Sequence, residues 1–351
     1  MAAGSFASLR ENVKYYQENN YAQLIRTIDL KNNFTNSDFV YVDEVAYDFL
    51  WRVQLKEPNI VLPNIGANIG EKYYVKPQDL PKNKNVLGPN AILLRSKCND
   101  THFVYFRLST SSYDNEMKKL VGASGQPKFN KTDLKKVSLF MPSLIEQKRI
   151  AYFLALLEER IATQNKIIDK LQSLIKGIAQ KIVRSNKPNV RLYECVECSS
   201  STQQESEVCE QGAYPVYGAN GIVGYLDDYN TEGEAVYIIK DGSGVGTVSY
   251  VTGKCSATGT LNTLQAKDGY SLQYVYYLLK VFNFEPYKTG MAIPHIYFKD
   301  YGKAKVFCPS YTEQLQYARL LSAIDSKLSV EKNTLRNLSL QKQYLLRQMF
   351  I

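Results

Sequence analysis

The chain has 351 residues, of which 44% are hydrophobic and 22% charged, with a net charge of +9. This composition is ordinary for a globular protein, and the length allows two or more domains. The longest uncharged apolar run, 150–157, is too short to cross a bilayer, and no N-terminal signal pattern is present, so we expect a cytoplasmic protein with no membrane partner.

The positive charge is unevenly distributed along the chain. The net charge is +5 over residues 1–143, +5 over 144–187, −4 over 188–309 and +3 over 310–351. A basic chain is compatible with nucleic-acid binding, because phosphates supply most of the affinity. The acidic third segment weakens that argument, although its acids and bases cluster separately and one face could still be positive.

The first 141 residues contain short apolar runs bounded by turn residues, which predict short strands at 23–28, 39–45, 59–65, 71–75, 91–95 and 137–140. A glycine-containing loop, 66–70, lies between two of these runs. The segment 101–111 fits a helix or a strand equally well.

From Pro142 the pattern changes to one long helix. Ser143 and Glu146 form an S-x-x-E capping box, in which each residue satisfies a backbone amide of the other. Apolar residues then recur in two heptad series, interrupted only by Gln164, and a sustained heptad predicts a narrow seam for a partner helix. The first series is Leu154, Ile161, Ile168, Ile175 and Ile182, and the second is Leu157, Leu171 and Ile178.

Residues 188–308 repeat the plan of the first segment with different letters. We expect strands at 190–196, 214–217, 222–226, 235–239 and 248–251, and a helix at 272–282. The glycine loop 242–246 lacks the third glycine of a dinucleotide-binding fingerprint, and a strand follows it, so it predicts a structural hairpin. The first segment has no counterpart to the opening strand expected at 190–196.

The long helix occurs twice. A shift of 167 residues places Pro309, Ser310, Glu313 and Gln314 on Pro142, Ser143, Glu146 and Gln147. The heptads also match, with Glu331 on the polar interruption Gln164. The second helix repeats the seam with Leu321, Leu328, Leu335, Ile324, Leu338 and Leu345. The match extends upstream, from Pro127 on Pro294 to Phe140 on Phe307, so the chain is an internal duplication.

The sequence offers little catalytic or metal-binding chemistry. Cys195 and Cys198 form a C-x-x-C pair, but no second closely spaced ligand pair accompanies it, so we expect reduced structural cysteines and no metal. There is no Walker loop, nucleophile elbow or H-E-x-x-H motif. We therefore predict no catalytic residues. His295, in the loop after Pro294, fits a DNA contact or a hydrogen-bonded turn residue equally well.

With the repeat in view, the chain resembles the specificity (S) subunits of type I restriction–modification systems. The resemblance is carried by the tandem P-S-x-x-E-Q helices, by the Tyr-Pro-Val-Tyr-Gly-Ala-Asn-Gly segment 214–221, and by the loop 289–295. It implies a mixed α/β fold in which two sheet-rich target recognition domains, 1–141 and 188–308, occur in tandem with two conserved spacer helices, 142–187 and 309–351. The helices would form an antiparallel coiled coil.

The same resemblance implies the partners and cofactors. Each recognition domain would read half of a bipartite, asymmetric site in double-stranded DNA, and the helices would dock two methyltransferase (M) subunits. Restriction (R) subunits would complete an ATP-dependent endonuclease. The chain itself would be non-catalytic and hold no cofactor, with S-adenosylmethionine, ATP and Mg on the partner subunits.

Candidate site residues follow from this reading. For DNA contacts we select basic and polar residues ahead of each helix: Lys128, Lys131, Lys135, His295, Lys299 and Lys303. For subunit docking we select Arg149, Arg160 and Arg319 on the outer helix faces. The alternative for all of them is ordinary solvated charge.

A second functional class stays open at this point: a coiled-coil scaffold protein with two ligand-binding domains and no DNA binding. Loss of binding with rising salt would distinguish DNA binding from that alternative.

Overall fold

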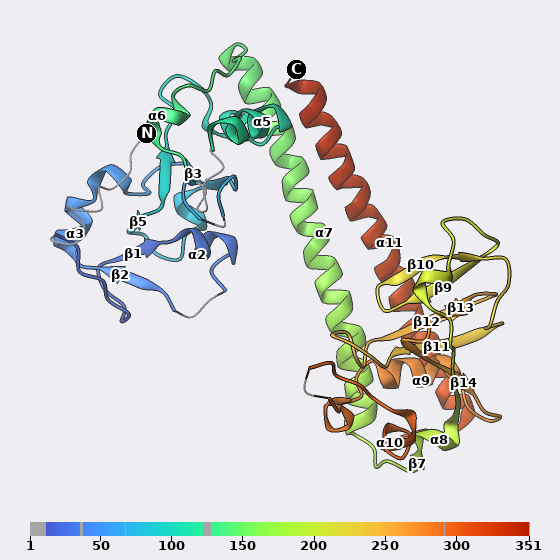
Figure 1. Ribbon diagram of the computed structural model, residues 1–351. Coiled ribbons are helices and arrows are strands. Elements are labelled where there is room, and N and C mark those ends of the chain that lie inside the picture. Colours follow the sequence, from blue (N-terminus) through green and yellow to red (C-terminus); the bar gives the residue numbers. More distant parts are fainter. Residues whose placement is uncertain (1–11, 36–37, 67, 122–127, 291, 351) are drawn as a thin grey trace. The chain divides into compact units, whose positions relative to one another are not determined.

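A computed structural model describes residues 12–35, 38–66, 68–121, 128–290 and 292–350. The chain divides into two compact units (Figure 1). The first unit comprises Met1–Ala162 and Arg336–Ile351, and the second comprises Thr163–Leu335. Two long helices, α7 (Leu144–Arg184) and α11 (Tyr311–Met349), each contribute to both units, so we describe each unit with its own part of each helix.

The first unit contains two three-stranded sheets. In one sheet, β1 (Ala22–Ile25) lies between antiparallel β2 (Val40–Val42) and parallel β5 (Asn85–Leu87). In the other, β3 (Asn59–Pro63) pairs antiparallel with β4 (Tyr73–Val75) and β6 (Ala91–Leu94). The unit's short helices are α2 (Thr27–Lys31), α3 (Glu44–Phe49), α4 (Thr101–Leu108), α5 (Ser111–Leu120) and α6 (Lys131–Leu134). Strand β3 is buried at every position, as a central strand requires.

The second unit is built on a four-stranded antiparallel sheet in the order β12-β11-β14-β8. These strands are β8 (Val196–Ser200), β11 (Glu234–Ile239), β12 (Val248–Thr252) and β14 (Leu261–Ala266). A second sheet, β10-β9-β13, contains β9 (Tyr214–Gly218), β10 (Gly221–Leu226) and β13 (Ser256–Ala257). A two-stranded ladder joins β7 (Val190–Arg191) to β15 (Lys305–Val306), and the short helices are α8 (Leu192–Cys195), α9 (Leu272–Leu279) and α10 (Phe298–Tyr301).

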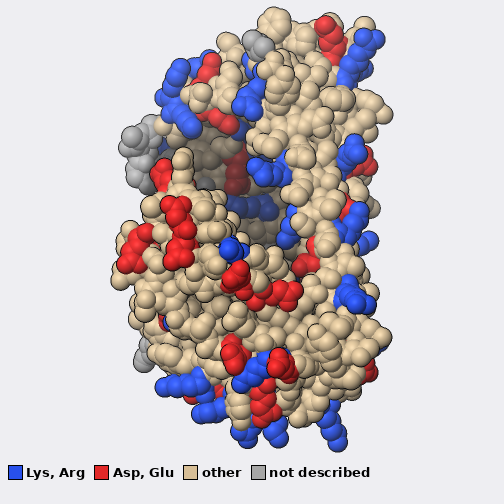
Figure 2. All heavy atoms as spheres, turned by 90° about the vertical axis from the view of Figure 1, so that its right-hand side faces the viewer, with Lys and Arg blue, Asp and Glu red and all other residues tan. Residues whose placement is uncertain are grey.

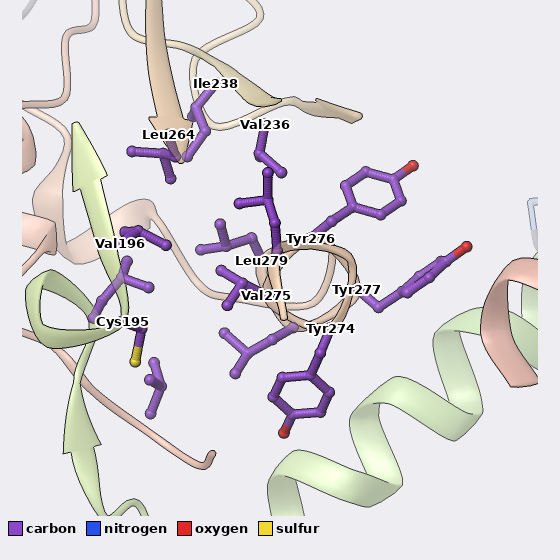
Figure 3. Packing of buried hydrophobic residues seen from close by; sticks show 14 of the residues in the cluster. Cys195, Val196, Val236, Ile238, Leu264, Tyr274, Val275, Tyr276, Tyr277 and Leu279 are labelled. Atoms are coloured by element: carbon purple, nitrogen blue, oxygen red, sulfur yellow. The ribbon is translucent and has the colours of Figure 1, made fainter. Parts of the chain in front are cut away.

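Helix α9 connects the main sheet of the second unit to the long helices (Figure 3). Figure 3 shows Val275 and Leu279 on the side of the helix nearer the sheet residues Val236, Ile238 and Leu264, all in one buried cluster. On its other side, Tyr274 and Tyr277 line a small cavity with Ala179 and Ile182 of α7 and Leu321 of α11. The ends of α7 and the start of α11 are therefore part of this unit's core.

The first unit has the same arrangement with the roles of the helices exchanged. Phe103 and Phe106 of α4 pack with Ala151 and Leu154 near the start of α7, and with Phe350 after the end of α11. Each unit thus joins its own short helix to the beginning of one long helix and the end of the other. This is the arrangement that an antiparallel helix pair with an internal duplication requires.

Contacts within each unit give the helices their antiparallel direction. In the first unit, Lys342 Nζ lies 2.5 Å from Glu158 Oε1, while Leu345 and Phe350 pack near Ala151 and Leu154. In the second unit, Gln164 contacts Glu331, whereas Ile182 lies near Leu321. The mixed α/β fold with two long antiparallel helices is confirmed.

Several local predictions are also confirmed. The predicted capping box is formed in α7, where the Ser143 amide donates to Glu146 Oε2 at 3.1 Å and the Glu146 amide donates to Ser143 Oγ at 3.4 Å. In α11 the Ser310 amide donates to Glu313 Oε2 at 3.1 Å. The glycine loop 242–246 connects the antiparallel strands β11 and β12, as a hairpin should.

Other local predictions need correction. The strand predicted at 137–140 is not formed: this segment has no regular secondary structure and pairs with no described strand, whereas its counterpart β15 has β7 as a partner. The predicted strand 190–196 is interrupted by α8. Most of the ambiguous segment 101–111 is helical: residues 101–108 form α4, and Ser111 begins α5. Asp100 caps the first turn of α4 by accepting from the Phe103 amide at 2.8 Å. The predictions missed several elements, among them the strands β5, β13 and β14, of which β14 is a central strand of the main sheet. They also missed the short helices α2, α3, α5, α6 and α10.

Candidate nucleic-acid interface

Two loops of the second unit are joined by their backbones next to the start of α10. The hairpin after β11 and the segment 289–296 form bridges at Asp241–His295 and Thr289–His295. The Gly242 amide donates to the Pro294 carbonyl at 3.0 Å, and the Ile296 amide donates to the Lys240 carbonyl at 2.9 Å. These bonds hold the histidine loop against the glycine hairpin, so its side chains start from a fixed backbone.

Glycine is required at one position of this loop. Gly290 has a φ of +88°, in the left-handed region, and an added Cβ would lie 2.3 Å from the Ile293 carbonyl oxygen and 3.0 Å from His295 Cδ2. No L side chain fits there without moving the backbone. The tight loop therefore depends on the glycine of the Thr-Gly pair at 289–290.

The imidazole of His295 is held by a carboxylate. His295 Nδ1 lies 2.7 Å from Asp241 Oδ1, and the two side chains are 34% and 35% exposed. The ring lies 6.5 Å from that of Tyr297, inclined by 23°. Asp241 was not among the predicted site residues, because nothing in the sequence indicates which acid will face His295 across 54 positions.

The side chains around His295 present both charge and apolar surface. Lys299 Nζ lies 5.3 Å from the centre of the Tyr297 ring, and Lys299 and Lys303 are exposed. Ile293 is 57% exposed and Tyr297 47% exposed. Exposed aromatic and cationic groups beside a fixed loop are suited to contacts with phosphates and bases.

The first unit has a corresponding junction between the loop after β3 and the segment before α6. Ile65 forms a bridge with Lys128, which occupies the position of His295 in the repeat. The Phe129 amide donates to the Asn64 carbonyl at 3.1 Å. Lys131 is half-buried, and Lys128 and Lys135 are exposed. Part of the preceding segment, residues 122–127, lies outside the described residues.

Charge alone does not single out this interface. Figure 2 shows acidic and basic side chains together on one face, where the acidic ones form several groups. The candidate interface is therefore defined by the loop geometry and its side chains, and the net charge of the segment adds little.

The predicted docking arginines, Arg149, Arg160 and Arg319, are all exposed on the long helices. Large apolar side chains accompany them at equivalent positions of the repeat. Leu144 and Tyr311 are 45% and 51% exposed, and Phe153 and Leu320 are 46% and 50% exposed. The two helices thus repeat one exposed apolar pattern.

The predicted seam residues face the interior to different degrees. Those that are buried are Leu154, Leu157, Ile168, Ile175, Ile182, Leu321, Leu328 and Leu338. Those that are partly buried are Ile161, Leu171, Ile178, Ile324, Leu335 and Leu345.

The polar interruptions of the two heptads contact each other in the second unit. Gln164 Nε2 donates to the Glu331 carbonyl at 3.0 Å and also to its carboxylate. Lys327 Nζ lies 2.5 Å from Glu331 Oε1, and its hydrogen bond is the main reason that the pKa of Glu331 is lower than its ordinary value. The hydrogen bond from Gln164 is the second reason. These two positions are equivalent in the repeat, so the polar interruption of one helix is bonded to that of the other.

Two glutamines of the repeated P-S-x-x-E-Q motif have a role that the prediction missed. Gln147 Oε1 accepts from the Asp100 amide and Gln314 Oε1 accepts from the Ser271 amide, both at 2.9 Å. Asp100 and Ser271 are the N-cap residues of α4 and α9. Each glutamine is 2% exposed and fastens its unit's short helix to a long one. Their repetition was a signal in the sequence.

No group of three or more His, Cys, Asp and Glu side chains suited to a metal occurs among the residues that the structure describes. Cys195 is buried, with its Sγ 3.6 Å from that of Cys308. Burial raises the pKa of Cys198 to about 11. Over the same described residues, no helix is both long and apolar enough to span a membrane.

A family model for the type I restriction modification DNA specificity domain matches the chain twice, at residues 9–173 and 189–339. The chain belongs to this specificity-domain family. Each match contains one sheet-rich segment and most of the long helix that follows it, so the duplication is one of specificity domains.

Several relatives share the specificity-domain family. The EcoprrI specificity subunit of Escherichia coli is 27% identical over 117 residues, which is 33% of this chain and 29% of the relative. A Methanocaldococcus jannaschii protein named as the type I restriction enzyme MjaX specificity subunit is 24% identical over 336 residues. The match covers 83% of this chain and 77% of the length of that protein. The match to the E. coli protein thus spans under a third of that relative.

Solved structures share the fold. The S subunit of a type I restriction-modification system from M. genitalium superposes with a TM-score of 0.62 at 20% identity, covering 84% of this chain and 83% of its own. A chain from a study of complex assembly and conformational transition of the type I R-M system gives a TM-score of 0.52 at 14% identity. The match covers 97% of this chain and 92% of that chain. These specificity-domain proteins have the same tandem α/β architecture.

Proposed function

We propose that this chain is the DNA-reading subunit of a type I restriction–modification complex and that it recognises a bipartite, asymmetric site. Residues 1–141 and 188–308 act as two target recognition domains, and residues 142–187 and 309–351 act as spacer helices. The observation that carries the proposal is the pair of specificity-domain matches, 9–173 and 189–339, each of which contains most of one proposed domain and of the helix that follows it.

Two domains on one chain solve a problem of discrimination. Each wrong base pair costs about 1–3 kcal/mol, so one domain that reads a few base pairs cannot select a rare site. Two domains that bind one duplex together multiply their selectivities. Because the two junctions differ, with Ile65 and Lys128 in one and Asp241 and His295 in the other, the two half-sites differ in sequence.

The DNA contacts are made by the side chains beside the two junctions. Lys128, Lys131 and Lys135 bind the backbone of one half-site through phosphate contacts, which fix the position of the domain. Lys299 and Lys303 do the same for the other half-site, where His295 is placed to contact a base edge or a phosphate.

The helices dock the partner subunits. Two methyltransferase subunits bind the outer faces, with contacts from Arg149, Arg160 and Arg319. The exposed apolar pairs at equivalent positions, Leu144 with Tyr311 and Phe153 with Leu320, support two copies of one partner. Restriction subunits join this core. S-adenosylmethionine, ATP and Mg are bound by the partners, so this chain is non-catalytic.

A methylation map tests the proposal. DNA from cells that carry the methyltransferase subunit is sequenced by a single-molecule method, with and without this chain. We expect a gapped, asymmetric motif that is modified only when the chain is present. If a stable complex forms but no motif depends on the chain, it does not select the site.

Binding at several salt concentrations tests the alternative of a scaffold without DNA. A complex that neutralises phosphates weakens steeply as salt rises, because bound counterions are released. Absence of any salt-dependent binding to duplex DNA by the assembled complex would favour the scaffold.

A further inference from the structure

We propose that Asp241 is a positioning residue for DNA recognition: it fixes the ring of His295 so that Nε2 is presented to the DNA. The inference rests on the proposed function, and it adds a residue that the sequence did not indicate. It concerns only the junction of two loops within the second unit.

The contact between the two side chains determines where the imidazole proton lies. An ionised carboxylate can only accept hydrogen bonds, so at 2.7 Å from Asp241 Oδ1 the Nδ1 atom of His295 must carry a hydrogen. Neutral His295 is therefore the Nδ1–H tautomer, and its free lone pair is on Nε2. A carboxylate that accepts from one ring nitrogen commonly selects the histidine tautomer at sites where the other nitrogen binds the ligand.

The surroundings also limit how the ring can turn. The His295 amide donates to the Thr289 carbonyl at 2.8 Å, and the Thr289 amide donates back to the His295 carbonyl at 2.9 Å. His295 Cδ2 lies so near Gly290 that a Cβ added to the glycine would come within 3.0 Å of it, and the centre of the Tyr297 ring lies 6.5 Å from that of the imidazole. Besides Asp241, the charged side chains carried by these loops and by α10 are Lys240, Lys288, Lys299 and Asp300. Among the described residues, none of these four is bonded to the ring.

The free nitrogen is suited to contact a polar group outside the chain. Nε2 has no hydrogen-bond partner among the described residues, and the side chain is 34% exposed. Neutral Nε2 accepts a hydrogen bond, as from the exocyclic amino group of adenine or cytosine. When protonated it donates, as to the O6 or N7 of guanine or to a phosphate. A ring whose orientation and tautomer are already fixed binds with less loss of conformational freedom.

The corresponding bridge of the first unit pairs Ile65 with Lys128, so a lysine occupies the place of the oriented imidazole. Among the residues described in this unit, no carboxylate forms an ion pair with Lys128. The pairing of Asp241 with His295 therefore contributes to a difference between the two half-sites.

A double-mutant cycle on the full chain in complex with its methyltransferase subunits tests the inference. Dissociation constants are measured by fluorescence anisotropy, at one salt concentration, for the duplex that the methylation map identifies and for a scrambled duplex. The variants are Asp241→Asn, His295→Gln and the double variant. Asp268→Asn, an exposed acid in the same unit, is the control for the change in net charge.

We expect Asp241→Asn to weaken binding to the mapped duplex about tenfold relative to the control, which corresponds to about 1.4 kcal/mol. Binding to the scrambled duplex should follow the control. In the His295→Gln background, Asp241→Asn should have no further effect. An equal loss in both backgrounds would overturn the positioning role, whereas absence of any preference of the unmodified chain for the mapped duplex would overturn the proposed function as well.

A second measurement uses the unmodified chain, so its result does not depend on whether the variants fold. Long-range nitrogen–proton NMR spectra of the chain labelled at histidine distinguish the two tautomers. We expect His295 to carry its hydrogen on Nδ1, and a ring with its only hydrogen on Nε2 would overturn the inference whatever the variants do.

Discussion

Gln314 fastens α9 to α11, and its replacement by leucine should destabilise the second unit. Its amide group makes two hydrogen bonds at 2.9 Å, accepting from the Ser271 amide and donating to the Pro309 carbonyl. Leucine has a similar size but can make neither bond. The Ser271 amide, in a residue that is 8% exposed, would be left without its partner.

The expected loss follows from those two groups. Leaving a buried donor unpaired costs about 1–3 kcal/mol, and the second bond contributes roughly 1 kcal/mol. The greater hydrophobicity of leucine offsets part of this, so we expect a net loss of about 2–3 kcal/mol. For a unit of this size each kcal/mol lowers the melting temperature by roughly 2–4 °C.

Calorimetry and hydrogen exchange measure the effect. Gln314→Leu should lower the melting temperature of the second unit by about 4–12 °C and speed amide exchange in 271–279. The exposed Gln316→Leu, two residues along the same helix, is the matched control. If the two variants had the same melting temperature and amide exchange in α9 were unchanged, the role assigned to the repeated glutamine in attaching α9 to α11 would be wrong.

Three further predictions follow from the seam, the interface and a buried phenol. Leu171→Asp places a charge in the helix seam and should dissociate the complex with methyltransferase subunits in size-exclusion chromatography; an intact complex with an unchanged methylated motif would refute the spacer assignment. Lys299→Gln should weaken binding to all duplexes and reduce the salt slope by about 1, whereas Lys267→Gln, exposed at a distance in sequence from the junction, should leave the slope unchanged. Burial raises the pKa of Tyr105 to about 12. This group therefore contributes its full stability below the unfolded pKa of about 10, and the contribution is lost as the pH rises toward 12. Denaturant unfolding at pH 9 to 12 should show a steeper decline for the unmodified chain than for Tyr105→Phe, and parallel declines would contradict it.

The long helices could be predicted from the sequence because their determinants are local. A capping box joins residues three apart, and a heptad series such as Leu154, Ile161 and Ile168 shows the seven-residue spacing of a helix seam directly in the sequence. The duplication added the second helix and the equivalence of Gln164 with Glu331. The family resemblance rested on the same repeated letters.

The ends of the strands and their pairing partners were harder to predict from the sequence, because a short strand forms only where a neighbouring strand supplies its hydrogen bonds. The segment 137–140 and β15 occupy equivalent positions of the repeat, yet of these two only β15 forms a ladder, since β7 lies beside it. Helix α4 could not be told from a strand because its cap, Asp100, is fastened by Gln147 from 47 positions away.

For the candidate interface too, the sequence predicted some residues, and only the structure showed which of them make contact. The sequence by itself placed His295, Lys299 and Lys128 beside the capped helices, because their positions repeat along the chain. Only the tertiary structure brought Asp241 within 2.7 Å of His295, since that contact joins two loops through backbone bonds that no local pattern encodes. Local periodicity thus determined the helices and the duplication, and long-range packing decided which side chains meet at the junction.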